Sequence, residues 1–67
     1  MARRLIDVNC TLEHETEKAV KVSTEVTADV WVPKSLCEIA KDNPNEDMPC
    51  QGTITLYEHV AVDKELV

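Results

Sequence analysis

The stretch "VWVPKS", residues 30–35, combines an alternating apolar pattern with a proline that ends it. Trp31 lies on the opposite face of this extended segment from the two valines that flank it, as expected for a strand with one solvated side. Pro33 lacks the N–H group that a further ladder hydrogen bond would need. We therefore expect a strand over residues 27–33 that ends at the proline.

The residues after Pro33 predict a short helix. Ser35 and Glu38 form a Ser-x-x-Glu pattern, in which the hydroxyl accepts a hydrogen bond from the backbone N–H of Glu38 and the carboxylate reaches back. Leu36, Ile39 and Ala40 follow at helical spacing. We expect a helix of about two or three turns, ended by the proline-containing loop at residues 42–49.

Two strands are predicted before this stretch. In "LIDVNCTL", residues 5–12, apolar and polar residues alternate, and "KAVKVSTEV", residues 18–26, repeats the pattern with Val20 and Val22 inward. An antiparallel hairpin is the simplest way to pair them. The inward side of the first strand comprises Ile6, Val8, Cys10 and Leu12.

A fourth strand is predicted at "CQGTITLY", residues 50–57, with Ile54 and Leu56 inward. The tail after Tyr57 has two interpretations: β-branched residues favour a strand through Val62, whereas helical spacing would bring residues 57, 60 and 61 to one side. The pattern predicts a single α+β domain over residues 1–67. It is a small antiparallel sheet or partly open barrel of about four strands, with one short helix after the third strand and, in one interpretation, a C-terminal helix.

The composition of the chain limits the classes of partner that it is expected to bind. Thirteen acidic residues face seven basic ones, giving a formal net charge of -6. Affinity for free nucleic acid rests on cationic contacts with phosphates, so a basic protein surface is favoured over nucleic acid. The pattern of a membrane-surface helix, a signal peptide or a spanning segment is not found, which favours a cytoplasmic location. A domain of this size buries little surface, and a homodimer is one way to gain stability.

The sequence gives no support for catalysis. Its three cysteines and two histidines, Cys10, Cys37, Cys50, His14 and His59, form neither a nucleophile motif nor a close pair of metal ligands. We therefore expect a protein that is not an enzyme and uses no cofactor or metal. The cysteines are interpreted as reduced, small apolar residues of the core.

Two acidic clusters are candidates for partner contacts. At strand spacing Glu13, Glu15 and Glu17 would project from one side, about 6 to 7 Å apart. The alternative is a solvated turn that keeps an edge strand from pairing. Trp31 is interpreted either as an interface residue or as a ring covered by the helix or the tail. The candidate partner-binding residues are Glu13, Glu15, Glu17, Trp31, Lys34, Asp42, Glu46 and Asp47.

Two stretches of the sequence, one of them containing Trp31 and Lys34, resemble a known sequence pattern. "ETEKAV", residues 15–20, followed by "DVWVPKS", residues 29–35, is similar to the pattern E-T-x-K-A … V-W-[LV]-P-K-S of short uncharacterised proteins of phages and prophages. The resemblance implies an origin in a mobile element and favours a tail that turns helical after Tyr57. It implies no activity, because the family has no known common function.

Analogy with small acidic phage proteins suggests a role. Such proteins act as stoichiometric inhibitors of host machinery, for example CRISPR effector complexes, whose channels are positively charged. We therefore expect an anti-CRISPR-type protein that binds a basic surface of a host nucleic-acid-processing or defence protein. The alternative hypothesis is a small barrel-like nucleic-acid-binding module that uses Trp31, Lys34 and the pair Arg3 and Arg4.

Overall fold

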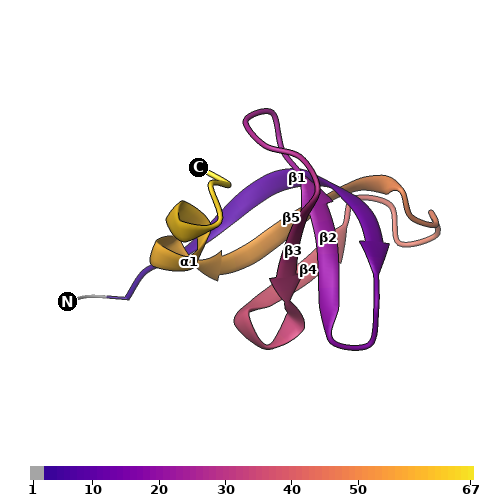
Figure 1. Cartoon of the computed structure of the whole chain (residues 1–67). Helices are drawn as coiled ribbons and strands as arrows, with labels where there is room; N and C mark the ends of the chain where they lie inside the picture. The colour runs from indigo at the N-terminus through magenta and orange to yellow at the C-terminus, as the bar shows by residue number, and fades with distance from the viewer. Residues whose placement is uncertain (1–2) are drawn as a thin grey trace.

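The computed structural model describes residues 3–67, which form a curled antiparallel sheet of five strands and one short helix (Figure 1). The predicted domain of residues 1–67 also includes residues 1 and 2, which lie outside the described part. The elements are β1 (Leu5–Glu15), β2 (Ala19–Ser23), β3 (Val30–Pro33), a 3-10 turn η1 (Lys34–Leu36), β4 (Cys37–Lys41), β5 (Cys50–Tyr57) and α1 (Glu58–Asp63). The strand order is β3-β2-β1-β5-β4.

The connection from β3 to β4 forces the sheet to curl. These strands are the two edges of the sheet, yet η1 joins them with only three residues. In a flat sheet four strand spacings would separate them by about 19 Å. The four peptide units from Pro33 to Cys37 span at most about 14 Å even when fully extended. The sheet must therefore bend until its edges approach each other.

β1 is the strand on which the two halves of the sheet meet. Its residues from Leu5 to Leu12 pair with β5, and its residues from Thr11 to Glu15 pair with β2. The register with β2 shifts between Leu12 and His14, which leaves Glu13 as an extra residue. Such a bulge bends a strand and increases its twist. It therefore helps β1 to pass from one half of the sheet to the other.

The core lies inside the curl and, among residues 3–67, contains no buried polar side chain. Most inward positions predicted for the four strands are buried there, and Ile6 and Val30 are partly buried and pack against the core. Ala28, also predicted to point inward, is exposed because β3 begins only at Val30. Because the chain has no Phe, aliphatic side chains and cysteines fill this space. The core residues are Val8, Cys10, Leu12, Val20, Val22, Val32, Cys50, Ile54, Leu56, Ala61 and Leu66.

The predicted helix after the third strand is wrong. One 3-10 turn follows Pro33, and β4 begins at Cys37. Ser35 makes no side-chain cap hydrogen bond to this turn. Residues 37–41 fit a strand because Cys37 and Ile39 alternate with exposed residues, and β5 provides a partner, with Ile39 opposite Ile54. Pairing with β5 overrides the local helical spacing, and the sheet has five strands instead of about four.

The tail is helical, as the resemblance implied, and the strand interpretation is wrong. α1 ends at Asp63, and two residues later Glu65 has a φ of 61°. The N–H of Leu66 donates to the carbonyl of Ala61 at 2.8 Å and that of Glu65 to Val62 at 3.0 Å, the two bonds of a Schellman motif. This reversal brings Leu66 back onto the core. Within residues 3–67, α1 and the 3-10 turn both fall far short of a membrane-crossing helix.

Candidate interaction surface

The two acidic clusters predicted as contacts lie at separate places on the molecule. Glu13, Glu15 and Glu17 belong to the end of β1 and the turn to β2, whereas Asp42, Glu46 and Asp47 belong to the loop between β4 and β5. Figure 1 shows this turn and this loop as different corners of the fold. The structure therefore does not join all six carboxylates into one patch.

The first cluster does not form the expected row of like charges. The bulge at Glu13 interrupts the alternation, so Glu15 lies opposite the buried Val20. The carboxylate of Glu15 lies 2.8 Å from Lys34 Nζ. This hydrogen bond from Lys34 lowers the pKa of the Glu15 carboxyl. The pair neutralises part of the predicted acidic cluster and connects the end of β1, next to the β1–β2 turn, to η1.

Trp31 remains partly exposed, and only the 3-10 turn η1 follows β3 where the longer helix was expected. Its side chain keeps 44% of its accessible surface. Across the sheet it lies opposite Lys21, which in turn lies opposite His14. The rings of Trp31 and His14 meet edge to face with centroids 6.2 Å apart, and Lys21 reaches Asp29 at 3.5 Å. Local neighbours, not the helix or tail considered above, therefore support the indole.

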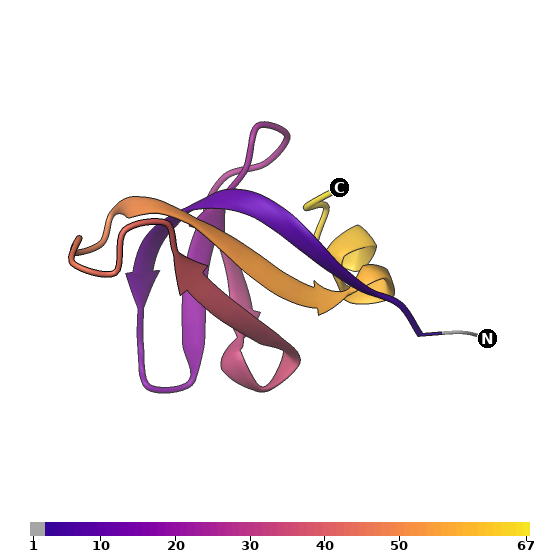
Figure 2. The same cartoon turned by 180° about the vertical axis from the view of Figure 1, so that it is seen from behind.

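The outward residues of β1, β5 and β4, the half of the sheet away from Trp31, form a second surface that the sequence analysis did not predict. Figure 2 shows the backbone of these three strands from behind. Three cross-strand hydrogen bonds connect β1 and β5 there: Thr55 donates to Asp7 Oδ1 at 2.6 Å, Thr53 to Asn9 Oδ1 at 3.5 Å, and Gln51 to the Thr11 hydroxyl at 3.0 Å. We call this surface the polar face. Its residues are Asp7, Asn9, Thr11, Gln51, Thr53, Thr55, Glu38, Ala40 and Asp42.

The charge of the polar face is entirely negative. Glu38 lies opposite Thr55, which lies opposite Asp7, and Asp42 extends the pairing through a bond from its N–H to the Gln51 carbonyl at 3.1 Å. Within residues 3–67 the ion pairs are Lys21 with Asp29 and Lys34 with Glu15, so none involves this face. The alternation in the sequence indicates the outward residues of each strand, but it does not show that β1, β5 and β4 are neighbours.

The loop from β4 to β5 extends this acidic region. Glu46 and Asp47 are exposed in it. Lys41 donates from Nζ to the backbone carbonyl of Glu46 at 2.9 Å, which holds the loop without pairing with its carboxylates. The predicted contacts Asp42, Glu46 and Asp47 therefore adjoin the polar face, whereas Glu13, Glu15 and Glu17 do not share it.

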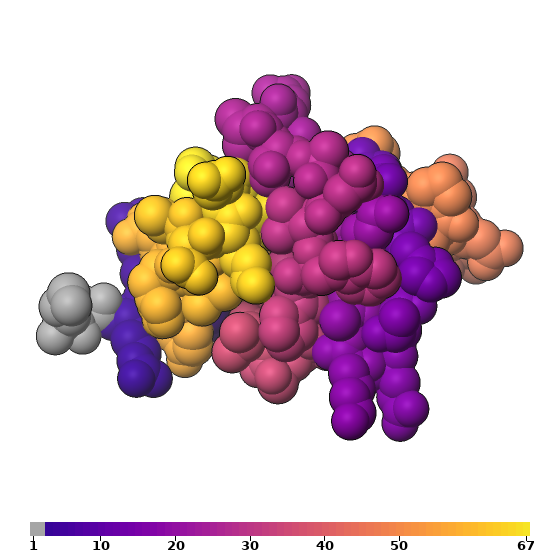
Figure 3. Space-filling model, viewed as in Figure 1, coloured from indigo at the N-terminus to yellow at the C-terminus, as the bar shows by residue number. Residues whose placement is uncertain are grey.

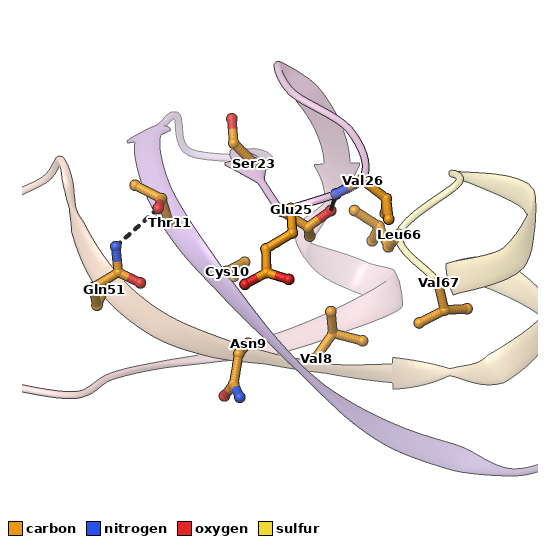
Figure 4. Close-up of a pocket in the computed structure, with 11 residues that line it drawn as sticks. Val8, Asn9, Cys10, Thr11, Ser23, Glu25, Val26, Gln51, Leu66 and Val67 are labelled. Atoms are coloured by element: carbon orange, nitrogen blue, oxygen red, sulfur yellow. Dashed lines mark hydrogen bonds between the residues drawn. The ribbon is translucent and has the colours of Figure 1, made fainter.

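A groove of about 590 Å³ runs along β1 between the β2–β3 loop and the C-terminal tail. These two segments stand beside each other in Figure 3. Val8 and Leu66 line the groove, with Val26 and Val67 at its rim, and the side chain of Glu25 extends over β1 (Figure 4). Its remaining lining residues are Asn9, Cys10, Thr11, Ser23, Thr24 and Gln51.

The cysteines have the character of core residues. All three are free thiols. Burial raises the pKa of Cys10 to about 11 and also raises that of Cys37. A thiol is a nucleophile only as the thiolate, so both stay protonated near neutral pH. Within the described residues no three Cys, His, Asp or Glu side chains come together as a metal site would need.

No protein-family model, curated protein or solved structure matches this chain.

Proposed function

We propose that this protein is a small interaction protein without catalytic activity that binds a basic surface of a host nucleic-acid-processing or defence protein. The polar face is the observation that carries this proposal. It offers three strands of exposed side chains with the carboxylates of Asp7, Glu38 and Asp42 and no cation. A positively charged channel is complementary to such a surface, and complementary potentials speed association and select partners.

The form of this face suits an inhibitor that acts stoichiometrically. Hydrogen bonds between neighbouring strands hold Asp7 and its neighbours in place before a partner arrives. A surface that is already ordered loses less side-chain entropy on binding. Together with the sequence resemblance to phage and prophage proteins, this supports an anti-CRISPR-type role in the host cytoplasm.

Capture from bacterial lysate at low and moderate salt tests the proposal. The immobilised protein should retain nucleic-acid-binding proteins, and a purified target should lose its activity at about one equivalent of inhibitor. The variant Asp7→Asn/Glu38→Gln/Asp42→Asn should lose both effects. A control with the same change of charge elsewhere, Glu17→Gln/Glu58→Gln/Asp63→Asn, should keep them. Absence of any nucleic-acid-binding protein at both salt concentrations would contradict the proposal.

The exposed ring of Trp31 favours one alternative, a nucleic-acid-binding module. Stacking of a base on such a ring contributes about 1 to 3 kcal/mol. However, Lys34 is engaged by Glu15, and Arg3 lies over the Tyr57 ring near the other end of β1, 5.9 Å from its centroid. Titration with single-stranded oligonucleotides distinguishes the two functions, because quenching of the lone tryptophan that is reversed by salt would support the module.

A further inference from the structure

Part of the β1 edge has no neighbouring strand. β5 pairs with β1 from Leu5 onward, but β2 begins to pair with it only at Thr11, opposite Ser23. Residues 5–10 therefore have a strand partner on one side only. The groove lies along this unpaired side, since Val8, Asn9 and Cys10 line it together with the β2–β3 loop.

The hydrogen-bond pattern determines which backbone groups face the groove. The N–H of Glu58 donates to the carbonyl of Arg4 at 2.7 Å. In an antiparallel pair, hydrogen-bonded positions alternate. Residues 6, 8 and 10 therefore direct their N–H and C=O groups to β5, whereas Asp7 and Asn9 direct theirs away from it. Pairing of Thr11 with β2 fits the same alternation. Asn9 lines the groove, and Asp7 lies next to Val8, the first lining residue of β1. The two donors and two acceptors of Asp7 and Asn9 therefore follow this side of β1 in the geometry of a strand edge.

The walls of the groove suit an extended segment with apolar and cationic side chains. Val26 and Val67 are 71% and 60% exposed, so apolar surface remains uncovered at the rim. Glu25 extends into the groove (Figure 4), and within residues 3–67 neither Lys nor Arg lines it. A volume of about 590 Å³ falls within the range of clefts that hold ligands, about 300 to 1,000 Å³.

We propose that an extended segment of the basic partner adds as a strand to β1 at Asp7 and Asn9. Its backbone pairs with these two residues, one apolar side chain packs between Val26 and Leu66, and an Arg or Lys side chain reaches Glu25. This is strand addition, in which backbone hydrogen bonds provide affinity and side-chain pockets provide specificity. The inference rests on the proposed function for the basic character of the occupant, and it assigns recognition to the groove in addition to the polar face.

The peptide acetyl-Thr-Val-Arg-Val-Thr-amide is a suitable probe, titrated into isotopically labelled protein and followed by NMR. The backbone amides of Asn9, Glu25, Val26 and Val67 should shift, and hydrogen exchange at the Asn9 amide should slow. Replacement of Arg by citrulline, or Glu25→Gln in the protein, should weaken binding about fivefold, as expected for one partly exposed ion pair. Glu17→Gln, which removes the same charge elsewhere, should bind like the wild type.

N-methylated peptides test the strand geometry. Of two peptides methylated at complementary sets of alternate residues, one should lose binding and the other retain it, because only alternate N–H groups face β1. If both methylated peptides lost binding, or if neither did, the inference would be overturned. It would also be overturned if the peptide shifted only the amide signals of Glu38 and Thr53, or if no binding were seen at millimolar peptide. Shifts of Asn9 and Val26 with protein concentration alone would overturn it in favour of a second copy. Capture of a basic protein that depends on the polar face but not on Glu25 would leave the proposed function intact.

Discussion

At Gly52 the sheet leaves no space for a side chain. This residue occupies an inward position of β5 between Cys10 of β1 and Lys41 of β4. A Cβ atom there would lie 2.6 Å from Leu12 Cδ1 and 2.7 Å from the backbone oxygen of Ala40. The oxygen belongs to the β4–β5 pairing and cannot move away without disturbing it. Glycine is needed here for the close approach of three strands.

Gly52→Ala should therefore destabilise the protein by about 1 to 3 kcal/mol, the usual cost of overpacking. Urea denaturation followed by tryptophan fluorescence measures the change. Thr53→Ala, one position along the same strand on the polar face, is the control and should change stability by no more than about 0.5 kcal/mol. Equal stability of Gly52→Ala and the wild type would show that the strands can separate at this point.

The ion pair of Glu15 and Lys34 predicts a dependence on pH. Because the folded-state pKa of Glu15 is lowered, its contribution to stability is complete above the ordinary pKa of 4.5. That contribution is lost as the pH falls through the folded-state value. In Lys34→Met the Glu15 carboxyl should titrate in its ordinary range, as measured by NMR of the side chain. Lys21→Met removes the other ion pair and should leave this titration unchanged; an unchanged titration in Lys34→Met would contradict the role of Lys34.

At the scale of elements, the alternation of apolar residues predicted β1, β2, β3 and β5, because a strand with one buried face leaves a period of two in the sequence. β4 was missed because Leu36, Ile39 and Ala40 also fit helical spacing. These residues form a strand and not a helix because the edge of β5 is available to pair with them. A single inserted residue at Glu13 has no signature in composition, so the row of glutamates was predicted incorrectly. The polar face depends on which strands are neighbours, which local pattern does not specify.

The C-terminal tail is an element of the core, and its loss should be costly. Leu66 is only 2% exposed although it follows α1 at the end of the described chain. Leu66→Ala should reduce the free energy of unfolding by about 2 to 5 kcal/mol through loss of buried apolar contacts. Val67→Ala, at an exposed neighbour, is the matched control for the same denaturation experiment and should have a small effect. Similar midpoints for both variants would mean that the tail contributes little to the core.

At the scale of the whole molecule, the excess of acid opposes folding. The net charge is -6, and within residues 3–67 only two of the carboxylates form ion pairs. On the polar face Glu38 and Asp7 lie two strand spacings apart, about 10 Å, where two like charges repel by about 0.4 kcal/mol in water. Carboxylates that repel each other without nearby cations are consistent with the proposed function, in which a basic partner neutralises the polar face.

Neutralising the polar face should therefore stabilise the free protein while it abolishes binding. Asp7→Asn/Glu38→Gln/Asp42→Asn should have a higher thermal midpoint than the wild type at low ionic strength. Added NaCl should narrow the difference, because screening shortens the range of the repulsion. Calorimetry over a series of NaCl concentrations measures both effects. A midpoint equal to or below that of the wild type at low salt would argue that these carboxylates stabilise the fold.

The pairing of β1 with β5 also governs how the chain reaches its native state. Leu12 pairs with Cys50 and Leu5 with Tyr57, so the first and last strands in the sequence are neighbours in the sheet. The hairpins β1–β2 and β4–β5 can form from nearby residues, whereas the pairing of β1 with β5 joins residues far apart in the sequence. The entropy of closing the segment between the hairpins is lost before those contacts form. Sheets rich in distant pairings fold in about milliseconds to seconds. We therefore expect slow folding for so short a chain, with the joining of the two hairpins across β1 and β5 as its limiting step.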